Sequence, residues 1–112
     1  MPREAFQTLT VQMYYILLVM YDECCGVDIM ERVQKVSDGE ITIGPGTLYT
    51  LLGKFEQAGL IKVTAIEGRK KSYILTSSGK QRLKEEYYHL KKLVKVGQHF
   101  LEDKHRKEGL HE

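Results

Sequence analysis

Two short segments with β-strand character interrupt an otherwise helical pattern of apolar residues. Residues 61–66 and 72–76 are rich in β-branched and aromatic residues, and the sequence Glu67-Gly68-Arg69-Lys70-Lys71 lies between them. Such residues favour strands and glycine favours a tight turn, so the pattern predicts a β-hairpin with a cationic tip. Apolar residues elsewhere recur at helical spacing. We therefore expect a mainly α fold with one small antiparallel β-hairpin.

Three helices are predicted before the hairpin. The first is expected at about residues 5–24 and the second at about 26–37, where Ser37-Asp38-Gly39 provides a stop signal. The third begins at Gly44-Pro45-Gly46-Thr47, because proline suits the first helical position, and ends near Gly59. Between the second and third helices, residues 41–43 have the alternating polarity of a three-residue β-like piece.

A long helix is predicted after the hairpin. It begins in the cluster Thr76-Ser77-Ser78, whose hydroxyl residues favour helix N-caps, and runs to about His105. Three helices followed by a hairpin is the order of a winged helix-turn-helix domain, which we expect over residues 1–78. Residues 79–105 are expected to form a C-terminal dimerisation helix, and residues 106–112 a frayed tail.

Two apolar surfaces in this arrangement point to a homodimer. The run Met13–Tyr21 is apolar on all sides, which a helix on the surface of a monomer should not be. Apolar residues of the last helix recur every three or four positions, as in a heptad seam. We expect the two helices to cover each other across a two-fold axis. The predicted interface residues are Phe6, Met13, Ile16, Leu17, Met20, Leu83, Tyr87, Leu90, Val94 and Leu101.

Positive charge is concentrated in the middle third of the chain. Residues 41–82 contain seven lysines and arginines against two acidic residues, whereas residues 1–40 contain three against seven. A basic region of this kind is typical of proteins that bind nucleic acid. The alternative is a solvated surface on which cations cluster by chance.

The third predicted helix presents a non-acidic outer face. With Leu48 set inward and 100° per residue, Glu56 is expected to turn inward, away from that face. In a helix-turn-helix, such a face lies in the major groove, and the hairpin tip contacts phosphates. Alternatively, Tyr49 packs its ring on the second helix and the polar residues are only solvated. The candidate DNA-binding residues are Gly46, Thr47, Tyr49, Thr50, Lys54, Gln57, Arg69, Lys70 and Lys71.

Three motifs in this order resemble the short form of the PadR family of transcriptional regulators. They are the block from Gly46 to Leu52 (GTLYTLL), the helix end from Glu56 to Ile61 (EQAGLI), and the strand-to-helix corner from Gly68 to Gly79 (GRKKSYILTSSG). The resemblance covers about residues 8–94. It implies a homodimeric winged-helix repressor, dimerised by its last helix against its first. A two-fold dimer presents two recognition helices about one turn of B-DNA apart, so we expect a roughly palindromic operator. Family members usually carry proline where Thr50 stands and a basic residue where Gly53 stands.

A small-molecule effector is a further expectation. A flat hydrophobic or phenolic compound could bind among aromatic residues at the dimer interface, although the interpretation we favour is that these residues form the dimer core. Family members that sense drugs often use an interface tryptophan, and this chain has none. The candidate pocket residues are Tyr14, Tyr15, Tyr87, Tyr88 and Phe100.

Other function classes find little support in the sequence. Cys24 and Cys25 are adjacent and are expected to be buried, reduced thiols, and no histidine lies at metal-ligand spacing from them. No nucleophile or phosphate-binding motif indicates an enzyme, and no cofactor is expected. The longest apolar run has nine residues and the N-terminus lacks a signal-peptide pattern, so we expect a soluble, cytoplasmic protein. A winged-helix protein-interaction module without DNA binding is the alternative.

Overall fold

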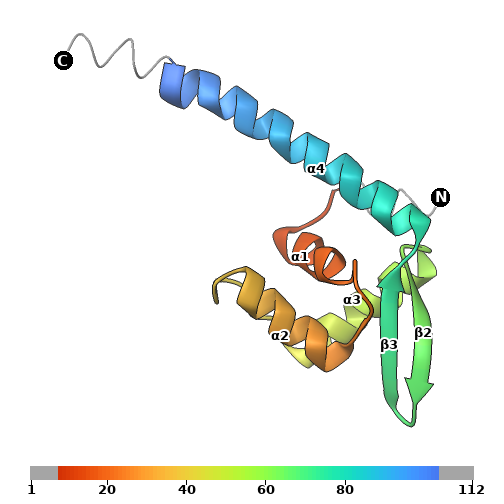
Figure 1. The fold of residues 1–112 in the computed structure, drawn as a ribbon. Helices are drawn as coiled ribbons and strands as arrows, with labels where there is room; N and C mark the ends of the chain where they lie inside the picture. Colours follow the sequence, from red (N-terminus) through yellow and green to blue (C-terminus); the bar gives the residue numbers. More distant parts are fainter. Residues whose placement is uncertain (1–7, 104–112) are drawn as a thin grey trace.

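The computed structural model describes residues 8–103 and shows a small helical body with a β-hairpin at one end and a long helix extending from it (Figure 1). This confirms the predicted fold class. Phe6 and residues 106–112, for which we made predictions, lie outside the described residues. Across residues 8–103, no helix combines the length and apolarity needed to cross a membrane. The elements in chain order are α1 (Val11–Val19), β1 (Cys24–Cys25), α2 (Gly26–Val36), α3 (Pro45–Gln57), β2 (Ile61–Glu67), β3 (Lys70–Leu75), α4 (Ser77–Gln98) and the π-helical turn η2 (His99–Asp103).

Helix α1 is shorter than the helix predicted at residues 5–24. Thr10 is its N-cap, and the Thr10 hydroxyl accepts a hydrogen bond from the backbone N–H of Met13 at 3.1 Å. At its other end the chain must extend to form β1, so the helix stops at Val19 although apolar residues continue. Helix α2 matches its prediction closely, and Asp38 and Gly39 after it have φ angles of 53° and 80°, which end the helix.

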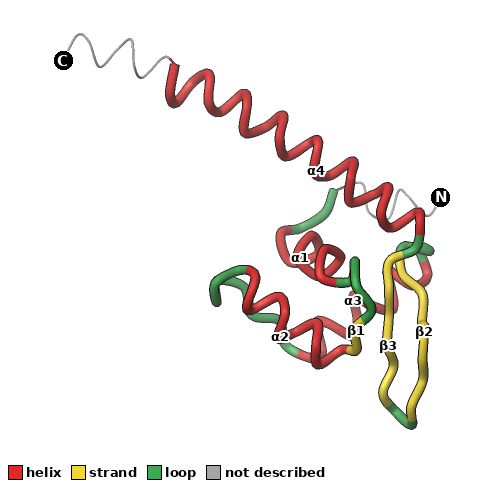
Figure 2. Tube along the Cα trace, viewed as in Figure 1, coloured by secondary structure: helices red, strands yellow, loops and turns green. Residues whose placement is uncertain are grey.

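The sheet has three antiparallel strands in the order β1-β3-β2 (Figure 2). Its third strand is β1, in which Cys24 pairs with Tyr73, rather than the piece predicted at residues 41–43. That prediction was wrong because the segment has no neighbouring strand. The backbone N–H of Ile41 instead donates to the Ser37 hydroxyl at 3.0 Å, and the buried Ile43 anchors the loop in the core.

Strands β2 and β3 and their turn form the wing. Its turn is tighter than predicted: only Gly68 and Arg69 lie between the strands, and Gly68 has a φ of 63°. A positive φ at the first central position suits a type II′ turn, which glycine favours. Lys70 and Lys71 therefore lie on strand β3, paired with Glu67 and Ile66.

The core encloses most of the apolar face of α1. Ile16, Leu17 and Met20 are fully buried by the rest of the described chain, with α4 lying across α1 and α2 beside it (Figure 1). The expectation that a single chain could not cover this helix is therefore wrong for these three residues. Val11, Leu18 and Tyr21 remain exposed.

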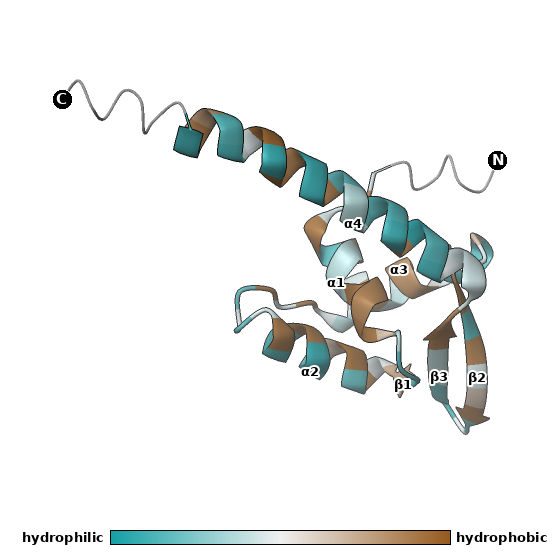
Figure 3. Ribbon diagram, turned by 45° about the horizontal axis from the view of Figure 1, so that its top comes forward, coloured by the Kyte–Doolittle hydropathy of each residue, from teal (hydrophilic) through white to brown (hydrophobic). Residues whose placement is uncertain are grey.

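Helix α4 belongs to the body only at its beginning. Its N-cap Thr76 accepts a hydrogen bond from the N–H of Gly79 at 3.0 Å, as the predicted cap cluster requires, and Gly79, Leu83 and Glu86 are buried. Beyond residue 90 every position up to 103 is exposed or partly exposed. The helix thus projects away from the core, with apolar residues along its free half (Figure 3).

Candidate nucleic-acid interface

The outer face of α3 is formed as predicted. The core side of this helix is buried through Leu48, Leu51, Leu52 and Phe55, which fixes its orientation. After it, Gly59 has a φ of 77° and the Leu60 N–H donates to the Phe55 carbonyl at 2.9 Å, which closes the helix. The six predicted DNA-binding residues of α3 all lie exposed: Gly46, Thr47, Tyr49, Thr50, Lys54 and Gln57.

The first turn of α3 is suited to an anion. Pro45 occupies the start of the helix, the N-cap Gly44 provides no side-chain cap, and no acidic residue lies in the first turn. The exposed N–H groups and the positive end of the helix dipole therefore face solvent beside Gly46 and Thr47.

The three cations of the wing are all exposed but face different surroundings. Arg69 lies in the turn, and Lys71 shares a strand face with the buried Tyr73 because side chains alternate along a strand. Lys70 points to the other face, where it lines a 230 Å³ cavity with the acidic residues Glu23, Asp28 and Glu67. Lys70 thus lies near three carboxylates, and it also lines the groove that Arg69 and Lys71 share with α3.

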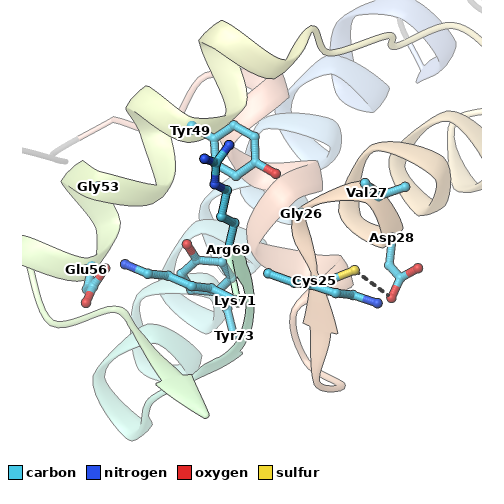
Figure 4. Close-up of a pocket in the computed structure, with 11 residues that line it drawn as sticks. Cys25, Gly26, Val27, Asp28, Tyr49, Gly53, Glu56, Arg69, Lys71 and Tyr73 are labelled. Atoms are coloured by element: carbon cyan, nitrogen blue, oxygen red, sulfur yellow. Dashed lines mark hydrogen bonds between the residues drawn. The ribbon is translucent and has the colours of Figure 1, made fainter. Parts of the chain in front are cut away.

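A groove of about 660 Å³ separates the wing from α3 and the start of α2 (Figure 4), and we call it the wing groove. It brings residues from three distant parts of the sequence together, with the Arg69 side chain extending from the wing toward α3. Its lining residues are Cys25, Gly26, Val27, Asp28, Tyr49, Gly53, Glu56, Arg69, Lys70, Lys71 and Tyr73.

Glu56 lies in this groove, contrary to the expectation that it turns inward. It is exposed and lines the groove with Lys71 and Tyr73. Burial, followed by the nearby Glu56 carboxylate and Tyr49, raises the pKa of Tyr73. The groove therefore contains two carboxylates, those of Glu56 and Asp28, beside the cations of the wing. The helical-wheel argument missed Glu56 because it considers α3 alone and not the wing beside it.

Tyr49 packs on α2, as the alternative interpretation expected, and its contact with DNA stays a prediction. Its ring packs against α2 at Gly26, and half of the side chain remains exposed. A Cβ atom built on Gly26 would lie only 2.3 Å from the Tyr49 hydroxyl oxygen. The tyrosine thus contacts α2 and also faces the groove.

The cysteines are placed as structural residues. Both are free and buried, and the Cys25 thiol donates a hydrogen bond to Asp28 Oδ2 at 3.2 Å. This hydrogen bond lowers the pKa of Asp28, with the backbone N–H of Cys25, Arg32 and Lys70 contributing less. Burial raises the pKa of Cys24 to about 11. Among the described residues, no group of three or more His, Cys, Asp or Glu side chains is arranged to hold a metal.

The predicted interface residues fall into two groups. Ile16, Leu17, Met20 and Leu83 lie in the core of the chain itself, so they offer no free surface to a partner. Met13 and Leu90 are partly exposed, and Tyr87, Val94 and Leu101 are 48%, 70% and 74% exposed. Leu93, Val96 and Phe100 add to this apolar surface on α4 and η2.

The five candidate effector residues lie in different parts of the described chain. Tyr14 lies near α4, where burial and the proximity of Tyr87 and Glu86 raise its pKa. The Tyr87 and Tyr88 rings meet edge to face, 5.4 Å apart. Tyr15 lines a cavity between α1 and α2, and the Phe100 ring meets the His99 ring edge to face in η2.

The protein has a winged helix-turn-helix fold. Helices α2 and α3 form the helix-turn-helix, α3 exposes a polar face, and strands β2 and β3 form the wing. A family model described as "Transcriptional regulator PadR-like family" matches residues 16–85. The chain therefore belongs to the PadR-like family of transcriptional regulators, as the sequence resemblance indicated. Membership of a family of regulators also agrees with the expectation that the chain is not an enzyme.

Three relatives illustrate the similarity. The transcriptional regulator YqjI of Escherichia coli K12 is 31% identical over 64 residues, which are 57% of this chain but only 31% of that protein. The chain thus matches about a third of the length of its curated relatives. A PadR family transcription regulator from Clostridium difficile is 28% identical with a TM-score of 0.63, covering 79% of this chain and 97% of that chain. Bacillus subtilis PadR in complex with operator DNA is 30% identical with a TM-score of 0.60, covering 70% of this chain and 47% of that chain.

Proposed function

We propose that this protein is a sequence-specific DNA-binding repressor that binds a palindromic operator as a homodimer. The observation that carries the proposal is the exposed, non-acidic face of α3 directly beside the cationic side of the wing groove. This arrangement suits a duplex, because α3 fits the major groove while the wing follows the adjacent phosphates. A structure of the related Bacillus subtilis PadR with operator DNA supports the same partner.

Within this proposal the nine exposed residues have different roles. Thr47, Thr50, Lys54 and Gln57 would read base edges, because they project from the outer face of α3. Tyr49, Arg69 and Lys71 would bind phosphates, together with the backbone at Gly46. Lys70 would contribute less, because Glu23, Asp28 and Glu67 surround it.

The dimer would form through the projecting part of α4. Large apolar side chains on a free helix, such as Val94 and Leu101 at 70% and 74% exposure, are costly in water and mark an interaction surface. We assign residues 1–78 to the DNA-binding domain and residues 79–105 to the dimerisation helix, and we place the protein on DNA in the cytoplasm. A two-fold dimer would present two α3 helices about 34 Å apart, one turn of B-DNA.

Release from DNA by a flat hydrophobic or phenolic compound completes the proposal. The aromatic residues of α1, α4 and η2 would enclose such a ligand where two chains meet, because Tyr15 lies between α1 and α2 whereas Phe100 lies in η2. The ligand must favour one spacing of the two recognition helices to act as a switch. A thermal-shift screen with planar aromatic compounds tests this step, and absence of any stabilisation would contradict it.

Selection of bound fragments from a genomic DNA library, followed by footprinting, tests the function itself. The proposal predicts a protected site with two inverted half-sites whose centres are about 10 base pairs apart. Failure to retain any duplex at low salt would instead favour the protein-interaction alternative.

A further inference from the structure

We propose that Gly26 is a positioning residue of the DNA interface. Because it lacks a side chain, the Tyr49 ring can lie against the first turn of α2, which fixes the direction of the Tyr49 hydroxyl in the wing groove (Figure 4). The inference rests on the proposed function, since it concerns the orientation of a residue that contacts DNA in that proposal.

The approach of the two residues is closer than any residue other than glycine allows. A Cβ atom on Gly26 would lie 2.3 Å from the Tyr49 hydroxyl oxygen and 2.8 Å from Cζ. The optimal separation of carbon atoms that are not bonded is about 3.5–4.0 Å, and real Cβ atoms essentially never lie within 3.0 Å of another residue's heavy atoms. The end of the Tyr49 ring therefore occupies the volume that a side chain at position 26 would fill.

The backbone does not require glycine at this position. Gly26 is the first residue of α2, and it is not among the described glycines with a positive φ, which are Gly39, Gly59 and Gly68. Glycine is a poor helix former compared with alanine. The close approach of Tyr49 is thus the structural feature that accounts for glycine here.

A methyl group at position 26 would redirect the tyrosine rather than unfold the domain. Tyr49 is 50% exposed, so its ring can rotate outward into solvent. The atoms that clash are at the far end of this side chain, and the three atoms nearest to the added Cβ all belong to Tyr49 rather than to a backbone. After rotation, the hydroxyl no longer faces the groove that it shares with Arg69 and Lys71.

The second glycine that lines the wing groove, Gly53, makes no such close contact. Gly53 also lines the groove, one turn of α3 after Tyr49, yet a Cβ atom built on it meets nothing within 4 Å. The restriction at Gly26 is therefore specific to its contact with Tyr49 and is not a general lack of space in the groove.

A double-mutant cycle on the full chain tests the inference. Wild type, Gly26→Ala, Tyr49→Ala and the double variant are titrated with a fluorescein-labelled duplex that carries the selected operator. We expect Gly26→Ala to bind at least about tenfold more weakly, because each subunit loses a hydrogen bond to a charged phosphate. Its melting temperature should be equal to or higher than that of wild type. The double variant should bind no more weakly than Tyr49→Ala, since the alanine then has no tyrosine to displace.

Controls and NMR spectra separate this role from a merely structural one. Gln34→Ala, an exposed substitution on the same helix, should leave affinity unchanged. In spectra of the ring protons, Gly26→Ala should shift the Tyr49 resonances and leave those of Tyr88 on α4 in place. If Gly26→Ala lowers the melting temperature, adding Tyr49→Ala should restore it, and failure to do so would overturn the inference.

The outcomes distinguish the inference from the function on which it rests. Wild type that ignores every duplex at low salt overturns the proposed function and the inference together. If wild type binds DNA, two results overturn the inference alone. One is that Gly26→Ala binds as tightly as wild type. The other is that Gly26→Ala weakens binding by the same factor in the Tyr49→Ala variant as in wild type.

Discussion

Gly79 and Leu60 join the beginning of α4 to the end of α3 by direct backbone contact. A Cβ atom on Gly79 would lie 2.0 Å from the Leu60 carbonyl oxygen. This oxygen also accepts a hydrogen bond from the Thr76 N–H at 3.0 Å. The contact holds the beginning of α4 on the body that carries the wing and α3, so it defines how α4 is oriented relative to them.

We predict that Gly79→Ala destabilises the fold. The atom in the way is a backbone oxygen held by a hydrogen bond, so α4 must shift as a whole, unlike the side chain that moves at Gly26. Overpacking of this kind costs about 1–3 kcal/mol. Urea denaturation should show a lower midpoint, and the exposed Lys84→Ala on the same helix serves as the control. A midpoint equal to that of wild type would show that the close packing at Gly79 does not contribute to stability.

We predict that Arg69→Ala and Lys71→Ala each weaken DNA binding and flatten its salt dependence. Each neutralised phosphate contributes about 0.9 to the slope of log affinity against log salt. The slope should therefore fall by about 0.9 for each phosphate that is no longer neutralised, and by twice that amount in a dimer. Lys70→Ala should have a smaller effect, because Lys70 shares a cavity with the acidic residues Glu23, Asp28 and Glu67, whose charges oppose the approach of a phosphate. Equal effects of all three substitutions would contradict the placement of Lys70.

We predict that Glu56→Gln strengthens DNA binding. The carboxylate lies in the wing groove with Lys71, so removing its charge leaves the groove more positive toward phosphates. Fluorescence anisotropy at low salt should show tighter binding by a few fold, a difference that shrinks as salt screens the charge. Weaker binding by Glu56→Gln would mean that the acid orients Lys71 instead of opposing DNA.

We predict that Val94→Asp converts the protein to monomers. Val94 is 70% exposed in the single chain and lies on the seam formed by Tyr87, Leu90 and Leu101, where a buried charge is costly. Lys95→Asp places the same carboxylate on the polar side of α4 and should leave the dimer intact. Sedimentation velocity distinguishes the two variants. A dimeric Val94→Asp protein would exclude this part of α4 from the interface.

We predict that Cys24 makes stability fall at alkaline pH. Burial raises its pKa from 9.0 to about 11, so the folded protein retains the thiol proton where the unfolded chain has lost it. The folded state binds more protons between these values, and the free energy of unfolding therefore decreases as pH rises from 9 to about 11. Urea denaturation of wild type and Cys24→Ala should show a steeper decrease for wild type. Parallel curves would contradict the shift.

The sequence predicts the elements that have their own local signals. Helices α2 and α3 and the start of α4 follow from apolar spacing, Pro45, Gly59 and Thr76, and the wing follows from its β-branched residues. Strand β1 could not be predicted in this way, because a segment of two residues has no periodicity. Its residue Cys24 pairs with Tyr73, which lies 49 positions further along the chain. Long-range pairing of this kind depends on how the body packs and not on the local sequence.

In the candidate site, too, local features could be predicted from the sequence and contacts between distant residues could not. The exposure of the outer face of α3 could be predicted from a helical wheel, since Leu48 fixes the inward direction. The wheel misplaced Glu56 because it contains no information about the wing packed beside α3. It also could not show that the Tyr49 ring ends at Gly26, a contact between residues 23 positions apart.

The central claim is that the protein binds a palindromic operator as a dimer. Footprinting tests it most directly, with the purified protein bound to a genomic fragment that it has selected. We expect protection of two inverted half-sites separated by about one helical turn, by a species that sedimentation shows to be a dimer, with affinity that falls steeply as salt rises. Protection of a single half-site by a monomer, or no protection even at low salt, would contradict it.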